Sequence, residues 1–132
     1  MIRLAATALA AGIVLTLSLA AVANGSTYRG AGVDDEQMPV KLKLTDGDLI
    51  FDYTDVLVHC SDGSSPRQGG ASHTDRLNQR NRFKDRLEIG GATSLVKGKV
   101  KERKATGTLT YDLAYEGGEC HSGEVEWKAK RK

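Results

Sequence analysis

The chain has 132 residues, with 19 Lys and Arg against 17 Asp and Glu, three His and two Cys. This length fits one domain of ordinary size and is too short for several. Beyond the first 23 residues no apolar run is long enough to cross a bilayer, so we expect no membrane span after them.

Residues 1–23 have the build of a cleaved secretory signal. A positive charge at Arg3 precedes a long Ala- and Leu-rich stretch, which ends on the small residues Ala21, Val22 and Ala23. The alternative is a retained membrane anchor, because Leu4 to Ala23 carries no charge. We expect a signal peptide over 1–23 and one secreted or periplasmic domain over 24–132.

The first strands are expected between residues 40 and 60. Apolar residues alternate with lysines over 40–44, and Asp46-Gly47 is a strong hairpin signal before the next apolar run. From Leu49 to Cys60 the apolar phase changes near Asp52 to Asp55. We therefore expect a bulge or tight bend there, which would return the side chains to one buried face.

Residues 61–81 form a polar stretch rich in Gly, Ser, Asn, Gln and Arg, and we expect an irregular Arg-rich loop. Loops of this length are uncommon unless they bind something or are disordered. Disorder, a short helix around Thr74 to Arg80, and a binding loop are the alternatives.

Period-two patterns continue after this loop, over 83–89, 96–100, 105–115 and 124–130. Asp85 is the one polar residue on the apolar face of its segment, and Trp127 is expected in the core. The sequence predicts an all-β fold, an antiparallel meander of about seven to eight strands that forms a small β-sandwich or barrel.

Two cysteines in an exported chain favour a disulfide between Cys60 and Cys120. The alternative is a metal site, because His59 precedes Cys60 and His121 follows Cys120. Zinc sites place their ligands in close pairs, and adjacent residues of a strand point to opposite faces, so we expect no metal. With a disulfide, the two His would be neighbours on the outer face.

No catalytic signature is found, so we expect a protein that is not an enzyme and uses no cofactor. The Gly-x-Ser-x-Gly and His-Glu-x-x-His motifs are absent. Asp46, Asp48, Asp52 and Asp55 lack the spacing of an EF-hand calcium loop, and carboxylates beside a hairpin are usually solvated.

Basic residues gather in and beside the 61–81 loop and on the segment that follows. The candidate binding residues for an anionic partner are Arg67, Arg76, Arg80 and Arg82. Lysines on strands have an alternative role, which is to keep a sheet edge from pairing with another chain. Nucleic acid is a poor candidate, because aromatic residues for stacking are scarce.

Several motifs resemble a group of short secreted bacterial β-proteins of unassigned activity. They are Ser26-Thr27-Tyr28-Arg29-Gly30, Cys60-Ser61-Asp62-Gly63, Val96 to Val100, Ala105 to Leu109, Cys120-His121-Ser122-Gly123 and Trp127 to Arg131. The resemblance implies a shared scaffold with Cys60 paired to Cys120. It carries over no catalytic or ligand residue, and the Arg-rich loop departs from it.

Two functions are compatible with these observations. The first is a non-catalytic secreted or periplasmic module that binds an envelope component, such as an anionic glycan, or a secreted protein. The second is an inhibitor of a secreted hydrolase. A small-molecule carrier is a weaker third, because it requires an apolar cavity inside a barrel.

Overall fold

The computed structural model describes residues 25–132, so the expected signal peptide lies outside the described residues. The described chain contains strands and turns and no helix, which confirms the all-β prediction. No segment of it is a helix long and apolar enough to cross a bilayer. The ten strands are β1 Ser26–Gly32, β2 Pro39–Thr45, β3 Asp48–Thr54, β4 His59–Cys60, β5 Gly70–Arg76, β6 Arg82–Ile89, β7 Ala92–Val100, β8 Lys104–Tyr115, β9 Gly118–His121 and β10 Val125–Arg131.

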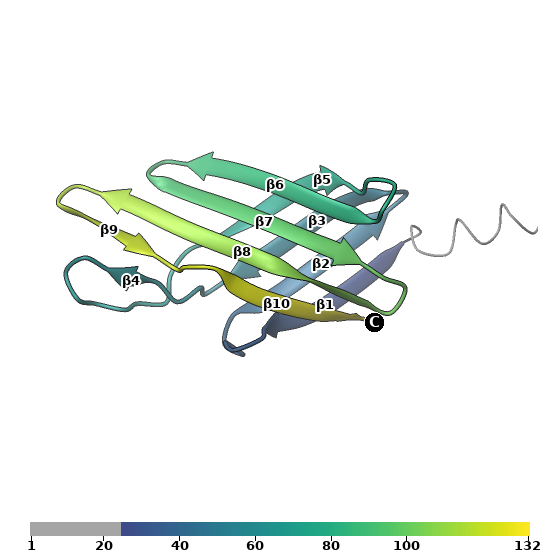
Figure 1. Ribbon diagram of the computed structural model, residues 1–132, viewed down its shortest axis with the longest axis horizontal. Coiled ribbons are helices and arrows are strands. Elements are labelled where there is room, and N and C mark those ends of the chain that lie inside the picture. The colour runs from purple at the N-terminus through teal and green to yellow at the C-terminus, as the bar shows by residue number, and fades with distance from the viewer. Residues whose placement is uncertain (1–24) are drawn as a thin grey trace, which may run out of the picture.

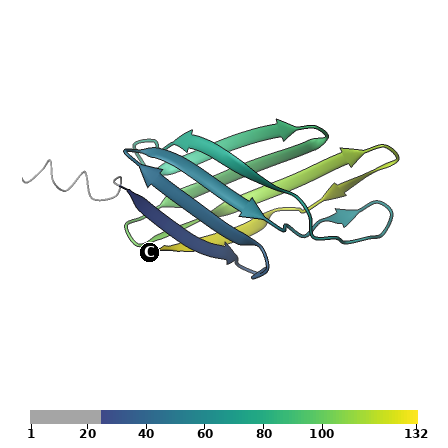
Figure 2. The same cartoon turned by 180° about the vertical axis from the view of Figure 1, so that it is seen from behind.

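All strand pairs are antiparallel, and together they make one strongly curled sheet, a half-barrel (Figures 1 and 2). Hydrogen-bonded neighbours follow the order β5-β3-β2-β1-β10-β8-β7-β6. The first and last strands, β1 and β10, pair with each other in the middle of the sheet. The long β8 pairs with β7 along one edge, and with β10 and then β9 along the other.

The core lies inside the curl and is filled by large side chains. Trp127, Phe51 and Phe83 form an aromatic cluster, with the Phe51 and Trp127 ring centroids 4.7 Å apart. Trp127 is 1% exposed, as expected of a core residue. The interior is therefore packed, which argues against a carrier with a large central cavity.

The local signals between residues 40 and 60 correspond to observed features. Asp46 and Gly47 both have positive φ, 51° and 86°, in the turn between β2 and β3. Asp55 also has positive φ, 55°, directly after β3, and Val56 and Val58 beyond it are fully buried. The predicted bend at the phase change is confirmed.

The prediction for residues 61–81 is wrong in part, because β5 occupies Gly70–Arg76 within the stretch expected to be one irregular loop. Apart from Gly70, β5 has one apolar residue, Ala71, so its sequence lacks the strand pattern. Tertiary context makes it a strand, because its backbone pairs with β3 from Thr54↔Gly70 to Asp48↔Arg76. Neither disorder nor a helix is found there.

β5 and β6 are the two edges that a closed barrel would join, but they are not paired as strands. Figure 2 shows them close together at the turn that connects them and diverging toward their other ends. Side chains bridge the near part of this seam: Asp75 accepts a hydrogen bond from the Lys84 backbone N–H at 2.9 Å, and His73 contacts Asp85. The sheet is therefore a half-barrel, the barrel-like form of the predicted fold, and its two outer edges are not paired as strands.

Candidate functional site

Basic side chains cover the outer face of six adjacent strands, β6, β7, β8, β10, β1 and β2. Their neighbours in sequence point into the core, as Val96, Leu42 and Ala129 do, so the lysines and arginines between them point outward. We call this set the basic face: Arg29, Lys41, Lys43, Arg82, Lys84, Lys97, Lys99, Lys104, Lys128 and Lys130.

The strand register places like charges directly opposite one another on this face. The cross-strand pairs are Arg82↔Lys99, Lys84↔Lys97, Lys104↔Lys130, Arg29↔Lys130 and Arg29↔Lys41. Within the described residues, the ion pairs involve Arg67, Arg76, Arg86 and the His side chains, and none includes a member of the basic face. Directly opposed like charges destabilise a sheet, so this arrangement lowers stability unless an anion lies over it.

Two shallow depressions run across the basic face and meet at Thr106. The larger has a volume of about 710 Å³ and is bordered by Arg82, Lys84, Lys97 and Lys99. The smaller, about 400 Å³, is bordered by Arg29, Lys104, Lys128 and Lys130. Phe83 is the one aromatic residue in either lining, and it is 4% exposed, so a ligand here would be held by charge and hydrogen bonding without ring stacking.

The four arginines expected to bind a partner are separated in the structure. Arg67 makes a two-point ion pair with Asp35, with N–O distances of 2.7 and 3.0 Å, and Arg76 pairs with Asp48 at 2.6 Å. Arg80 lies in the turn between β5 and β6. Arg82 belongs to the basic face, and Arg76 lines the larger depression beside it.

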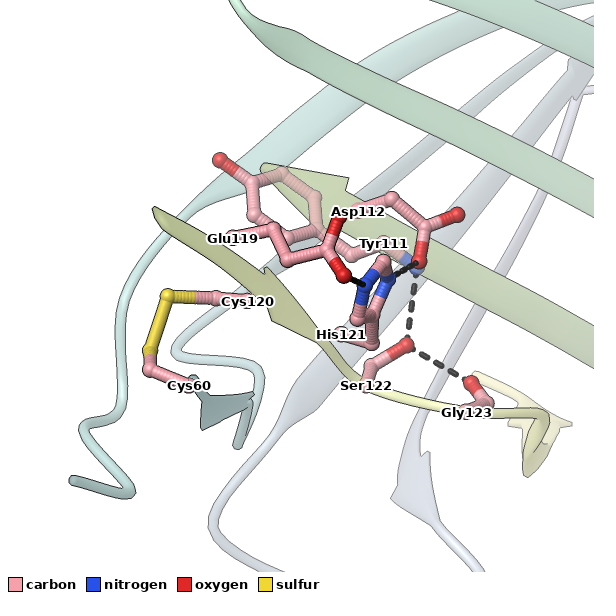
Figure 3. A network of polar contacts seen from close by, with 8 residues as sticks. All are labelled: Cys60, Tyr111, Asp112, Glu119, Cys120, His121, Ser122 and Gly123. Atoms are coloured by element: carbon pink, nitrogen blue, oxygen red, sulfur yellow. Dashed lines mark hydrogen bonds and ion pairs between the residues drawn. A yellow bond between two sulfur atoms is a disulfide. The ribbon is translucent and has the colours of Figure 1, made fainter. Parts of the chain in front are cut away.

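The disulfide end of the molecule holds a second polar cluster (Figure 3). Cys60 and Cys120 are bonded, with their Cα atoms 3.9 Å apart, and they join β4 to β9. His59 and His121 are cross-strand neighbours, as expected from the disulfide. His59 Nδ1 lies 2.9 Å from Ser65 Oγ, so the two His have separate partners.

His121 lies between two carboxylates. Its Nδ1 is 2.7 Å from Asp112 Oδ1, and its Nε2 is 3.3 Å from Glu119 Oε1. The hydrogen bond to Asp112, and then that to Glu119, raises the pKa of His121 above its ordinary value of 6.5. Within the described residues no group of three His, Cys, Asp or Glu side chains has the arrangement of a metal site.

A third cluster lies inside the half-barrel, and none of the predicted site residues belongs to it. His73 on β5 is fully buried, and its Nε2 is 2.8 Å from Ser94 Oγ on β7. His73 Nδ1 is 2.9 Å from Asp85 Oδ2 on β6. The hydroxyl of Tyr53, on β3, also hydrogen-bonds to Ser94.

One signal in the sequence did point to this cluster. Asp85 interrupts an otherwise apolar strand face, and a carboxylate on the core side of a strand requires a hydrogen-bonding partner. The sequence alone could not identify His73 as that partner, because β5 was not recognised as a strand. Burial raises the pKa of Tyr53 to about 12, so its phenol keeps its proton and remains a donor at neutral pH.

Comparison of the chain with family models, with curated proteins and with solved structures finds no match.

Proposed function

We propose that this protein is an exported module that binds an anionic polymer, such as a charged envelope glycan, through the basic face. The observation that carries the proposal is the register of like charges between β6 and β7 and among β8, β10, β1 and β2, since none of the ion pairs of the described residues includes these cations. A polymer with regularly spaced anionic groups would offset that repulsion.

The composition of the basic face favours a charged polymer over other ligands. Lysines outnumber arginines, and a lysine ammonium is a flexible point charge without the planar geometry of two-point recognition. Neutral sugars and nucleic-acid bases are commonly bound by stacking on exposed aromatic rings, which the linings of the two depressions lack.

Export is part of this proposal. Disulfides persist mainly in oxidising compartments such as the periplasm or the extracellular space, and Cys60 is bonded to Cys120. The resemblance to short secreted bacterial β-proteins supports the same compartment.

Retention on immobilised heparin and on polygalacturonate, with neutral dextran as the blank, tests the proposal. We expect retention on both polyanions, weakening as salt rises because exposed charges are screened. Lys97→Gln/Lys99→Gln should elute at clearly lower salt than the unmodified protein.

A control variant distinguishes binding at the basic face from a general effect of the protein's net charge. Thr54→Glu/Thr74→Glu changes the net charge by the same amount on exposed positions of β3 and β5, two strands that carry no member of the basic face. Equal weakening by both variants would reject the assignment to this face, and no retention of the unmodified protein on either polyanion would reject the function. Retention of a purified secreted hydrolase instead, with loss of its activity, would favour the inhibitor alternative.

A further inference from the structure

We propose that Ser94 is an activated nucleophile and that the domain cleaves esters of short acyl groups at this residue. Three consecutive strands, β5, β6 and β7, bring His73, Asp85 and Ser94 into one hydrogen-bonded line. A serine, a histidine and a carboxylate in this order make up the constellation of acyl-transfer enzymes, which is recognised by geometry and not by sequence position. The inference is independent of polymer binding at the basic face.

The hydrogen-bond directions in the cluster suit a nucleophile. An ionised Asp85 only accepts, so the Nδ1 atom of His73 donates to it. The Nε2 atom of a neutral His73 is then an acceptor and takes the hydroxyl hydrogen of Ser94. Tyr53 donates to Ser94 Oγ from the other side, and its ring stacks on His73 at an interplanar angle of 15°, which fixes the imidazole.

A cavity gives a small substrate access to Ser94. It has a volume of about 130 Å³ and is lined by Gly70, Ala71, Leu87, Ile89, Ala92, Ser94 and Tyr111. Gly70 and Ala71 of β5, and Leu87 and Ile89 of β6, come from the ends of these strands that lie away from the turn connecting them. Since one water molecule occupies about 30 Å³ in the liquid, the cavity holds a few heavy atoms, which is enough for a short acyl group.

The lining explains why an ester is the expected substrate. Ala71, Leu87, Ile89 and Ala92 present apolar surface, and Ile89 at the seam is 65% exposed. An acyl chain would lie against these side chains, with its carbonyl carbon toward Ser94 Oγ.

The reaction balances with water as the second substrate. Ser94 Oγ attacks the carbonyl carbon, and its proton passes to His73 Nε2. The bond from that carbon to the alcohol oxygen breaks, and the alcohol leaves with the proton from His73. Water then attacks the acyl-serine, gives one proton to His73, and the acid leaves as Ser94 recovers that proton. Asp85 stabilises the transient imidazolium.

A fluorophosphonate probe tests whether Ser94 is activated in the folded protein, with the adduct located by peptide mass spectrometry. We expect one adduct on Ser94, and hydrolysis of 4-nitrophenyl acetate that Ser94→Ala abolishes above background. Ser72→Ala is the matched control, because Ser72 is exposed on the same strand as His73 but lies outside the cluster. It should leave both reactions unchanged.

Asp85→Asn separates a catalytic role from a structural one. Asp85 is partly exposed, so an amide in its place should keep the fold, as judged by near-ultraviolet circular dichroism of Trp127. The rate of labelling should nevertheless fall by about 100-fold or more, the scale of a lost acid–base contribution. If folded protein gives no Ser94 adduct, or if Asp85→Asn labels as fast as the unmodified protein, the cluster only holds the seam together and the proposal is wrong.

Discussion

Glycine 107 shows how a single residue sets the packing of the core. It lies opposite Gly98 in the β7–β8 pair, and Trp127 packs over both positions. A Cβ at residue 107 would collide with the Lys97 carbonyl oxygen and would lie 2.6 Å from the Trp127 ring. A backbone carbonyl cannot move away as the end of a flexible side chain can, so nothing larger than glycine fits.

We therefore expect Gly107→Ala to destabilise the domain by about 1–3 kcal/mol or more, the usual range for overpacking. Urea unfolding followed by Trp127 fluorescence measures the change. Thr106→Ala is the control, because this neighbour is exposed on the outer face. Similar losses in the two variants would contradict the packing explanation.

His121 is a second single residue with a large-scale effect, because it makes the free energy of unfolding depend on pH. Its folded pKa is raised by Asp112 and Glu119, so the protonated form is favoured in the folded state. This contribution is fully present below the unfolded pKa, near 6.5, and is lost as the pH rises through the folded pKa.

Thermal unfolding of His121→Gln and of the unmodified protein, compared between about pH 5 and 8, measures this contribution. We expect the difference in Tm to be greatest at the acidic end and to decline toward the alkaline end. Asp112→Asn should reduce the same pH dependence. A difference in Tm that grows with pH would contradict this account, because protonated His121 would then not be the stabilising form.

Among the elements, β4 depends most on a covalent link. It has two residues, and the segment around it is attached to β9 by the disulfide and by the Ser61 N–H to Glu119 carbonyl hydrogen bond of 2.8 Å. A strand of this length contributes little pairing of its own, so the Cys60–Cys120 bond is the strongest link between β4 and β9.

Replacing both cysteines by serine should lower the free energy of unfolding by about 4 kcal/mol, the chain-entropy value for a loop of 60 residues. Amide hydrogen exchange should also accelerate most over 57–67, while β1 and β2 in the middle of the sheet change least. Uniform acceleration along the chain would indicate that the disulfide has no special role for β4.

For the whole molecule, the basic face has opposite effects on stability and on binding. Its like charges destabilise the fold, and the same charges attract an anionic polymer. Its rows of opposed cations repel one another, and the Debye length falls to about 10 Å at 0.1 M salt. We expect moderate salt to raise the Tm through screening of this repulsion, although the same salt weakens polyanion binding.

Lys99→Glu tests both effects in one protein. Residue 99 lies opposite Arg82, so the substitution turns a repulsive pair into an attractive one, worth about 0.2–1 kcal/mol. We expect a higher Tm at low salt together with weaker retention on heparin, with Lys99→Gln intermediate in both. A lower Tm for Lys99→Glu would contradict the electrostatic account of the face.

The sequence by itself determined the strands with strong alternation, the Asp46-Gly47 turn, the bend after Asp52, the burial of Trp127 and the pairing of the two cysteines. Each depends on local chemistry: a period of two, a positive φ, or two cysteines in a chain expected to be exported. Ile89 and Tyr115 show the limit of such patterns, because both continue an apolar phase and yet are exposed where their strands leave the core.

Other features of the fold and of the candidate sites depend on the tertiary structure, because local sequence patterns do not encode them. β5 is a strand because β3 offers it a free edge, and that pairing brings His73 to Asp85 and Ser94. The basic face likewise depends on register, since lysines from Lys41 to Lys130 become neighbours only when β1 and β10 pair. Both candidate sites depend on contacts between different strands, which strand periodicity does not encode.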